Sequence, residues 1–371
     1  MQIPLLDLGA QYAGIKDAVA ERLARVIERQ RFILGPEVAE LEEGVARYCN
    51  TRFGVGVASG TDALLLSLKT LDLRPGDEVI TSPFTFFATA GAIHNARGVP
   101  VFVDIDPATF TLDARAVEDA ITPRTRAIVP VHLYGQMATM ELLGPLAERH
   151  GLAIVEDAAQ AIGARRRIDG SWHKAGQLGA LGALSFFPSK NLGGWGDGGM
   201  IVTQDDATAE RLRRLRTHGG AQQYHHDEVG FNSRLDTLQA AVLLAKLPHL
   251  DAWAEGRRRV ARRYDEALGN LDGVTVPTVD PANEHVYHQY TIRAARRDDL
   301  KRCLQEREIG CAVYYPKSLH RQPCFAALDY AAGSLPQAER ATAEVLSLPV
   351  YPELTAEAQD RVIETIGRFY T

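Results

Sequence analysis

The chain has 371 residues, of which 46% are hydrophobic and 24% charged, a composition typical of globular proteins and unlike that of disordered or collagen-like chains. A formal net charge of -6 argues against a nucleic-acid partner, because such binding depends mainly on cations that neutralise phosphates. The charge gives no reason to expect binding to anionic membranes, and no apolar stretch reaches the ~18 residues of a membrane span.

The N-terminus and the cysteines indicate the compartment. Residues 1–7 have neither the basic start nor the apolar core of a secretory signal, so we expect a cytoplasmic protein. The four cysteines show no CxxC pair or other zinc spacing, which predicts free thiols in a reducing compartment. They are Cys49, Cys303, Cys311 and Cys324.

Short apolar runs alternate with amphipathic segments between residues 55 and 203. Strands are predicted at Val55–Ala58, Glu78–Thr81, Val99–Val103, Ala127–Val131, Ala153–Glu156 and Met200–Thr203. Helices are predicted at Thr61–Lys69, Phe87–Asn95, Met140–His150 and Ala207–Arg216. This alternation predicts an α/β fold, with a mostly parallel sheet flanked by helices on both sides.

The pattern changes after residue 236. A helix is predicted at Thr237–Leu247 and, beyond Pro248, a second one at Leu250–Leu268. Further strands are predicted at Tyr287–Ile292 and Ala312–Tyr315, and further helices at Asp298–Glu308 and Ala356–Phe369. We therefore expect a large domain over residues 1–250 and a smaller C-terminal α+β domain over residues 251–371.

A lysine and a carboxylate stand at the ends of two apolar runs. The run 182–190 ends in Lys190 and is followed by a glycine-rich stretch, and the run Leu152–Val155 is followed by Glu156 and Asp157. Such a pair is the minimum that a pyridoxal phosphate enzyme needs, because the lysine forms the Schiff base and the acid pairs with the pyridine nitrogen. Either residue alone is more simply a surface residue after a strand.

Two further segments are consistent with binding a phosphate group and a flat cofactor ring. Gly60 and Thr61 open a predicted helix after a strand, where free N–H groups bind anions, although Ser59 or Thr61 can equally be a helix cap. Phe86 follows a strand and can stack on a cofactor ring or pack in the core. The GxGxxG at 194–199 leads into a strand, which favours a tight loop over a dinucleotide site.

Other polar residues are ambiguous on sequence alone. The three histidines at 218, 225 and 226 have no carboxylate or cysteine at a ligand spacing typical of a closed metal site, so no metal is expected. Arg234 suits either solvent or an anionic substrate, and Tyr314, Tyr315, His320 and Arg321 form a polar-aromatic group of similar ambiguity.

Taken together, the segments 59–64, 155–160, 185–190, 196–199 and 230–241 resemble the DegT-type (DegT/DnrJ/EryC/StrS) sugar aminotransferases. The resemblance extends from Phe32 to Pro349, and the order and spacing of the motifs make it specific. It implies the fold type I architecture of pyridoxal phosphate (PLP) enzymes. It also implies a homodimer with its active sites at the subunit interface.

The resemblance assigns roles position by position. Lys190 is implied to be the Schiff-base lysine and Asp157 the partner of the pyridine nitrogen, with Gln160 at the phenolic oxygen of the cofactor and Phe86 on its ring. The phosphate is implied to be held by Gly60, Thr61 and Ser185, together with Asn232 of the neighbouring subunit. The substrate-binding residues are implied to be Arg234, Tyr314, Tyr315 and His320.

The expected activity is transfer of an amino group from L-glutamate to a keto-sugar nucleotide, with the cofactor alternating between PLP and pyridoxamine phosphate. Some relatives carry histidine in place of the lysine and act as dehydratases, so Lys190 favours the aminotransferase. Tyr224–His226 followed by 232–236 is similar to members that aminate C-3 of dTDP-linked 3-keto-6-deoxyhexoses or UDP-linked 3-keto-hexuronates. The product would serve a surface polysaccharide such as the O-antigen of lipopolysaccharide, or a glycosylated metabolite.

Three alternatives stay open at this stage. The first is C-4 amination of a 4-keto-6-deoxy sugar nucleotide. The second is a non-catalytic regulator that binds cofactor or sugar nucleotide, which the pair of Lys190 and Asp157 disfavours. The third is a Rossmann oxidoreductase, disfavoured because the GxGxxG does not open a helix.

Overall fold

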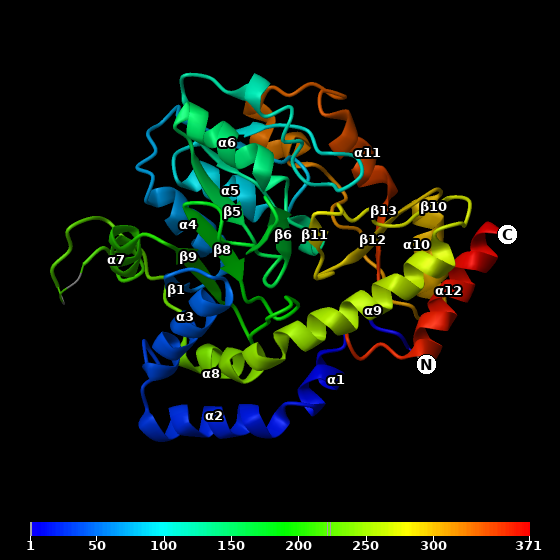
Figure 1. The fold of residues 1–371 in the computed structure, drawn as a ribbon, viewed down its shortest axis with the longest axis horizontal. Coiled ribbons are helices and arrows are strands. Elements are labelled where there is room, and N and C mark those ends of the chain that lie inside the picture. The colour runs from blue at the N-terminus through cyan, green and yellow to red at the C-terminus, as the bar shows by residue number, and fades with distance from the viewer. Residues whose placement is uncertain (1, 221, 223) are drawn as a thin grey trace.

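The computed structural model describes residues 2–220, 222 and 224–371, and a seven-stranded sheet lies at its centre (Figure 1). The strand order is β1-β9-β8-β5-β4-β2-β3. These strands are β1 (Phe53–Val57), β2 (Glu78–Thr81), β3 (Val99–Phe102), β4 (Thr125–Val129), β5 (Ala153–Asp157), β8 (Leu181–Ser185) and β9 (Gly199–Thr203). Neighbours from β8 to β3 are parallel, while β9 is antiparallel to both β1 and β8, so the predicted mostly parallel sheet is confirmed.

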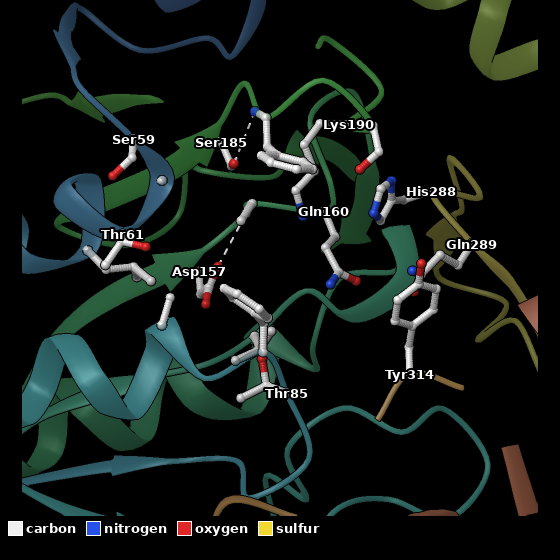
Figure 2. Close-up of a pocket in the computed structure, with 18 of the residues that line it drawn as sticks. Ser59, Thr61, Thr85, Asp157, Gln160, Ser185, Lys190, His288, Gln289 and Tyr314 are labelled. Carbon is white, nitrogen blue, oxygen red and sulfur yellow. Dashed lines mark hydrogen bonds between the residues drawn. The ribbon is translucent and has the colours of Figure 1, made fainter. Parts of the chain in front are cut away.

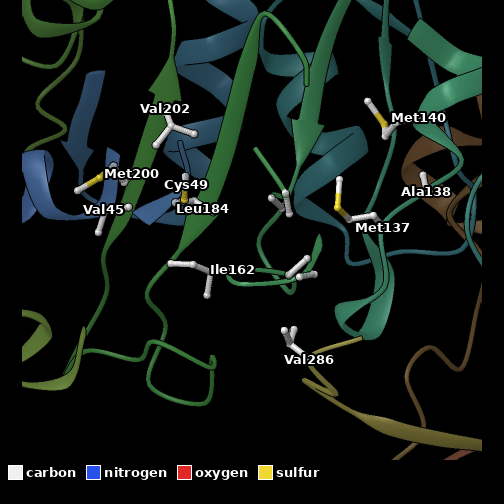
Figure 3. Close-up of a cluster of buried hydrophobic side chains, with 14 of the residues drawn as sticks. Val45, Cys49, Met137, Ala138, Met140, Ile162, Leu184, Met200, Val202 and Val286 are labelled. Carbon is white, nitrogen blue, oxygen red and sulfur yellow. The ribbon is translucent and has the colours of Figure 1, made fainter. Parts of the chain in front are cut away.

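Helices cover both faces of this sheet, and the alternation of side chains along each strand explains how (Figure 1). In β9, Met200 and Val202 lie in a buried cluster with side chains of α3, α6 and α8, and Figure 3 shows them beside Leu184 of β8. Ile201, between them, lies in a second cluster with α4, α5 and α7. These helices are α3 (Pro36–Tyr48), α4 (Gly60–Lys69), α5 (Ala88–Asn95), α6 (Met140–His150), α7 (Asp206–Leu215) and α8 (Thr237–Lys246).

The N-terminal helices α1 (Leu8–Ala13) and α2 (Lys16–Arg29) lie outside α8, and Figure 1 shows α2 running alongside it. Ile15 and Val19 pack there against Val242 and Ala245 in a small buried cluster. A 3₁₀ turn that contains Pro248 separates α8 from the long helix α9 (Leu250–Leu268), as the position of the proline predicts.

The C-terminal part is built on a three-stranded antiparallel sheet of order β10-β12-β13. Its strands are β10 (Val274–Thr275), β12 (Tyr290–Ala294) and β13 (Val345–Leu348), and its helices are α10 (Arg297–Glu306), α11 (Pro336–Glu344) and α12 (Ala356–Tyr370). Ile3 pairs with Ile309 and packs in the same hydrophobic cluster as α9 and α12. The division into residues 1–250 and 251–371 stays a prediction.

Short 3₁₀ helices complete the described part of the chain, at Glu118–Ala120, Leu133–Gly135, Leu247–His249, Leu319–Arg321 and Pro323–Leu328. Within residues 2–220, 222 and 224–371, no helix combines the length and the hydropathy needed to cross a membrane.

Two strand predictions are corrected by the structure. Only Ala312 of the predicted strand Ala312–Tyr315 pairs, in an isolated bridge to Ser347, and the tyrosines that follow lie in a loop. The strand predicted from Tyr287 begins at Tyr290, because Tyr287 has a φ of 43°, a left-handed conformation that a strand does not accommodate.

A small sheet of order β11-β6-β7 has no counterpart among the predicted elements. It consists of β6 (Arg165–Ile168), β7 (Ser171–Lys174) and β11 (Asn283–Glu284). Arg166 of β6 is 2% exposed and forms ion pairs with Glu141 and Asp280, so the buried side chain of this strand is a charged one.

Candidate active site

A cavity of about 410 Å³ lies at the carboxyl ends of β5 and β8, where ligands of open α/β sheets bind. Figure 2 shows the side chains of Asp157, Gln160, Lys190 and Tyr314 converging on it. Among the residues predicted for the site, those that line it are Gly60, Thr61, Phe86, Asp157, Gln160, Ser185, Lys190, Tyr314 and Tyr315.

The N-terminus of α4 borders the cavity on one side. Ser59 is its N-cap and accepts a hydrogen bond from the backbone N–H of Asp62 at 3.1 Å, so the capping alternative is realised. A Cβ on Gly60 would lie 2.6 Å from Cβ of Ser185, so only glycine lets this first turn approach the end of β8. Ser59, Thr61 and Ser185 all border the cavity beside the free N–H groups of the helix, an arrangement that suits an anion.

Asp157 ends β5 and is buried, with both carboxylate oxygens paired. Thr89 Oγ1 donates to Oδ2 at 2.7 Å, and the backbone N–H of Ala159 donates to Oδ1 at 3.2 Å. Burial raises the pKa of this carboxyl, while Thr89, Ala159 and the nearby Lys190 act in the opposite direction. The side chain is therefore fixed in place, and a cation in front of it would favour its ionised form.

The adjacent Glu156 points away from the cavity and anchors this end of the strand. Its carboxylate accepts hydrogen bonds from the backbone N–H groups of Gly176, Leu178 and Gly179, and it lies 2.7 Å from Nε2 of His132. The backbone N–H of His132 in turn donates to the carbonyl of Asp157 at 3.0 Å. The adjacent residues Glu156 and Asp157 thus point to opposite faces of the sheet, and only Asp157 faces the cavity.

Lys190 follows β8 in a tight turn, in which its N–H donates to the carbonyl of Phe187 at 2.8 Å. Burial lowers the pKa of its amine from 10.5 to about 8, an effect that the charge of Asp157 opposes. Within the described residues its Nζ has neither a hydrogen bond nor an ion pair, so the amine is available in the cavity.

The glycine-rich loop after Lys190 is held by helix α8. Gln239 Oε1 accepts the N–H of Trp195 at 2.7 Å, and Lys246 Nζ donates to the carbonyl of Gly193 at 2.7 Å. The loop then enters β9 directly, which confirms that the GxGxxG at 194–199 does not open a helix.

Gln160 and Tyr315 form a linked pair in the cavity wall. Gln160 accepts the backbone N–H of Tyr134 at 2.7 Å and donates to the hydroxyl of Tyr315 at 2.9 Å, which leaves one amide hydrogen free. Burial raises the pKa of Tyr315, so its hydroxyl stays protonated. Phe86 is 57% exposed and its ring centroid is 6.4 Å from that of Tyr315, so it borders open space rather than the core.

Three predicted residues do not line the cavity in this chain. His320 is buried and pairs through Nε2 with Glu339 at 3.0 Å, in contact with the rings of Phe102 and Tyr330. Asn232 is exposed, and Arg234 is half-buried. Their loop is tied to α4 by Ser233, whose hydroxyl donates to Asp62 at 2.6 Å.

Three residues at the cavity were absent from the set predicted from the sequence: Thr89 contacts Asp157 without lining the cavity, while His288 and Gln289 line it. Thr89 lies one helical turn beyond Thr85, within a segment already considered for Phe86, and its distance to Thr85 is 3.2 Å between the hydroxyl oxygens. His288 and Gln289 reach the cavity from the segment before β12, and no sequence pattern marks them. Elsewhere in the described ranges, no group of three or more histidine, cysteine or acidic residues is placed to hold a metal ion.

Comparison with known proteins gives a consistent result. The model of the DegT/DnrJ/EryC1/StrS aminotransferase family matches residues 14–367. A "pleiotropic regulatory protein" of Geobacillus stearothermophilus is 51% identical over 100% of this chain and 99% of its own length. A UDP-N-acetyl-3-dehydro-alpha-D-glucosamine 3-aminotransferase of Acidithiobacillus ferrooxidans is 46% identical over 99% of this chain and 97% of its own.

Streptomyces venezuelae supplies a further relative and a solved structure. Its dTDP-3-amino-3,4,6-trideoxy-alpha-D-glucose transaminase is 45% identical over 98% of this chain and 95% of its own. The crystal structure of S. venezuelae DesV in complex with a ketimine intermediate matches with a TM-score of 0.96 and 45% identity, covering 100% of this chain and 98% of that one. The expected fold type I architecture is therefore confirmed, and the chain belongs to the DegT/DnrJ/EryC1/StrS aminotransferase family.

Proposed function

We propose that this protein is a PLP-dependent transaminase that moves an amino group from L-glutamate to C-3 of a UDP- or dTDP-linked 3-keto sugar. Membership of the family makes it an aminotransferase, and two relatives act on or form 3-amino sugars linked to UDP and dTDP. The observation that carries the proposal is the shared cavity of Lys190 and Asp157, with a free amine facing a fixed, buried carboxylate.

The residues of the cavity fit PLP at three separate points. The capped N-terminus of α4 with Ser185 suits the phosphate, and the missing Cβ of Gly60 leaves the backbone close enough to contact it. Asp157 suits the cationic pyridine nitrogen, since Thr89 already fixes the carboxylate. When bound, the cofactor supplies an electron sink for the carbon that exchanges its amine.

The chain itself supplies positioning and proton transfer. The Lys190 amine, with a pKa lowered to about 8, would be the covalent attachment point and, once released, could move a proton between the substrate carbon and the cofactor carbon near neutral pH. Asp157 holds the proton on the pyridine nitrogen, and the free amide hydrogen of Gln160 is available to the phenolic oxygen. Phe86, exposed at the cavity, would contact the ring of the cofactor.

A homodimer completes the proposed site. Asn232 and Arg234 do not line the cavity of their own chain, which is what a role in the neighbouring subunit's site requires. Asn232 then contacts the phosphate of the partner's cofactor and Arg234 the partner's sugar nucleotide, with Tyr314 and Tyr315 contributed in cis. The cytoplasmic location and the role in surface polysaccharide or metabolite synthesis stay predictions.

A regulatory function is the second candidate, because the relative from Geobacillus stearothermophilus is named as a regulatory protein. A pure regulator would not need a free lysine amine opposite a buried carboxylate, and this chain retains both. Catalysis is therefore the better supported function.

The experiment is a panel of 3-keto and 4-keto sugar nucleotides, linked to UDP or dTDP and incubated with the purified protein, PLP and L-glutamate. We expect amino-sugar product from 3-keto substrates, with nitrogen on C-3 by NMR. Product from 4-keto sugars alone would overturn the regiochemistry in favour of C-4. The absence of any product, with an unaltered cofactor spectrum, would favour the regulator.

A further inference from the structure

A small recess of about 50 Å³ adjoins the main cavity next to Lys190. Ser189, His288, Gln289 and Tyr314 line both spaces. The remaining wall of the recess comes from Leu5, Leu6, Arg257, Ser347, Leu348 and Val350. The volume has room for a carboxylate group or a few water molecules.

Arg257 of α9 is the charged group in this wall, and its position is fixed. The side chain is 3% exposed, and its Nη1 donates to the carbonyls of Tyr287 at 3.1 Å and Val350 at 2.7 Å, with that of His288 at 3.4 Å. Burial lowers its pKa to about 10, so the guanidinium is still a cation at neutral pH. A buried cation held only by carbonyl oxygens lacks a compensating anion.

The other edge of the guanidinium is free. Nε and Nη2 of Arg257 have no hydrogen-bond partner among the described residues, and neither is among the buried atoms that are cut off from solvent without a partner. They are therefore not fully enclosed, and Arg257 is one of the residues that line the recess. This edge carries two parallel N–H groups, the geometry that binds a carboxylate in a bidentate way.

The surroundings do not neutralise this edge. Glu353 is the acidic group that acts on Arg257, but no ion pair joins them within the described structure, and Glu353 does not line the recess. Nδ1 of His288 donates to Oδ1 of Asn191 at 3.2 Å, because the amide nitrogen of Asn191 is engaged with the carbonyl of Val286 at 3.1 Å. Nε2 of His288 then carries the lone pair, and burial between Lys190 and Arg257 keeps the ring neutral by lowering its pKa.

We propose that the recess is the subsite for a carboxylate group of the amino donor, bound by the Nε–Nη2 edge of Arg257. The proposal rests on the transaminase function above and assigns a binding residue, Arg257, to a carboxylate of the L-glutamate donor. A carboxylate there supplies the missing anion, and a donor that lies along Ser189 and His288 places its amine toward Lys190. The neutral His288 accepts a hydrogen bond from that amine without repelling it.

The test compares Arg257→Lys with Arg259→Lys, a matched control on the exposed side of α9 whose guanidinium donates to the carbonyl of Pro352 at 2.9 Å. The PLP-loaded proteins are titrated at pH 8 with 2-methyl-L-glutamate, which has no Cα hydrogen to lose, and binding is measured by calorimetry. We expect Arg257→Lys to weaken binding about tenfold or more, because it loses a bidentate charge-assisted contact. Equal affinities in the two variants would overturn the proposal.

A second variant works in the opposite direction and covers the case in which Arg257→Lys does not fold. Glu353→Gln removes the opposing charge without touching the recess, so we expect tighter binding of the same ligand. Unchanged or weaker binding would contradict the proposal.

Two amide donors identify which carboxylate occupies the recess. In the wild type, L-isoglutamine lacks the α-carboxylate and L-glutamine the γ-carboxylate, and at least one of them should react about tenfold more weakly than L-glutamate. Equal reaction of all three would count against any carboxylate subsite. If even L-glutamate leaves the wild-type cofactor spectrum unaltered, the transaminase function itself fails, a result distinct from failure of the subsite.

Discussion

Lys190 and Asp157 are two ionisable side chains in one enclosed space, and burial acts on them in opposite ways. It lowers the pKa of the amine to about 8 and raises that of the carboxyl, because in each case the charged form is the less favourable one. The charge of each residue partly offsets the effect of burial on the pKa of the other. The pair is thus poised for a ligand that is attached at the amine and carries a positive charge near the acid.

The first prediction concerns the pH dependence of the Lys190 amine. A depressed pKa means that the neutral, nucleophilic amine predominates above about pH 8 rather than above 10.5. The rate at which cofactor-free protein combines with PLP, followed by stopped-flow absorbance, should rise with a midpoint near pH 8. The control is free lysine with a blocked α-amino group, reacted with PLP in the same way. If the rate for the protein has a pH midpoint as high as that of the control, the prediction is contradicted.

The second prediction concerns Thr89, which donates to Asp157 at 2.7 Å in a buried setting. Thr89→Val removes this hydrogen bond with little change in shape, so the carboxylate loses a partner that stabilises its charged form. We expect PLP to bind about five- to thirtyfold more weakly, measured by equilibrium titration.

The control for Thr89 is Thr203→Val. Thr203 is also buried, but its hydroxyl donates to the carbonyl of Ala180 at 2.9 Å and not to Asp157. An equal loss of PLP affinity in both variants would show that the effect of Thr89 is general destabilisation.

The position of some residues in the cavity could be predicted from the sequence, and that of others could not. Lys190 and Asp157 were predictable because each follows a buried apolar run, and the ends of parallel strands meet at one edge. His288 was not, since it reaches the cavity from an irregular segment whose course depends on long-range packing. His320 shows the converse: it follows Tyr315 by five residues, yet its side chain is buried against Glu339 and does not line the cavity.

Among the elements, the N-terminus of α4 has the clearest link from sequence to function. Its Ser59 cap orients the first turn, and Gly60 allows that turn to lie against Ser185. The N-terminus of α4 and the end of β8 together form the proposed phosphate site. One methyl group added at Gly60 should therefore displace one of the two and disturb the site.

The third prediction is therefore Gly60→Ala. Its Cβ would lie 2.6 Å from that of Ser185, which forces the helix start or the strand end to move. We expect the affinity for PLP to fall about tenfold or more, measured by titration. Gly367→Ala in α12 is the control, because its Cβ meets nothing within 4 Å and should stabilise the helix by about 0.5–1 kcal/mol in denaturant titrations. A Gly60→Ala protein with wild-type affinity would contradict the prediction.

Elements with strong hydrophobic periodicity were predictable, and those defined by tertiary contacts were not. The helix Leu250–Leu268 has the predicted bounds, because its apolar face and the preceding proline mark both its course and its start. The strand β6 was missed, since Arg166 is buried only through its pairing with Glu141 and Asp280. The apolar run at Ala312–Tyr315 lacks a partner strand beyond one bridge.

At the scale of the whole molecule, the proposed dimer explains why part of the predicted site is not in the cavity. Asn232 and Arg234 lie in a loop fastened to α4 by Ser233 and Asp62, so the loop is positioned although its side chains do not line this chain's cavity. Sequence similarity could assign these residues to a site, but in the proposed dimer that site would be the partner's, which the geometry of one chain does not display.

The fourth prediction is complementation between two inactive variants, Lys190→Ala and Asn232→Ala. If Asn232 acts in the partner's site, a mixed dimer holds one site with both residues intact. Random mixing should then restore about a quarter of the wild-type sites, measured as turnover after denaturation and refolding together. No recovery, with mixed dimers verified by mass spectrometry, would show that both residues serve the same chain's site.

The central claim is that Lys190 operates a two-step amino transfer in this cavity, and the cofactor spectrum tests it most directly. Wild-type protein loaded with PLP should lose its visible absorbance band when L-glutamate is added and regain it when a 3-keto sugar nucleotide follows. Lys190→Ala protein should bind PLP yet fail to complete this cycle. A folded Lys190→Ala variant that cycles like the wild type, or a wild type whose spectrum does not respond to L-glutamate, would contradict the claim.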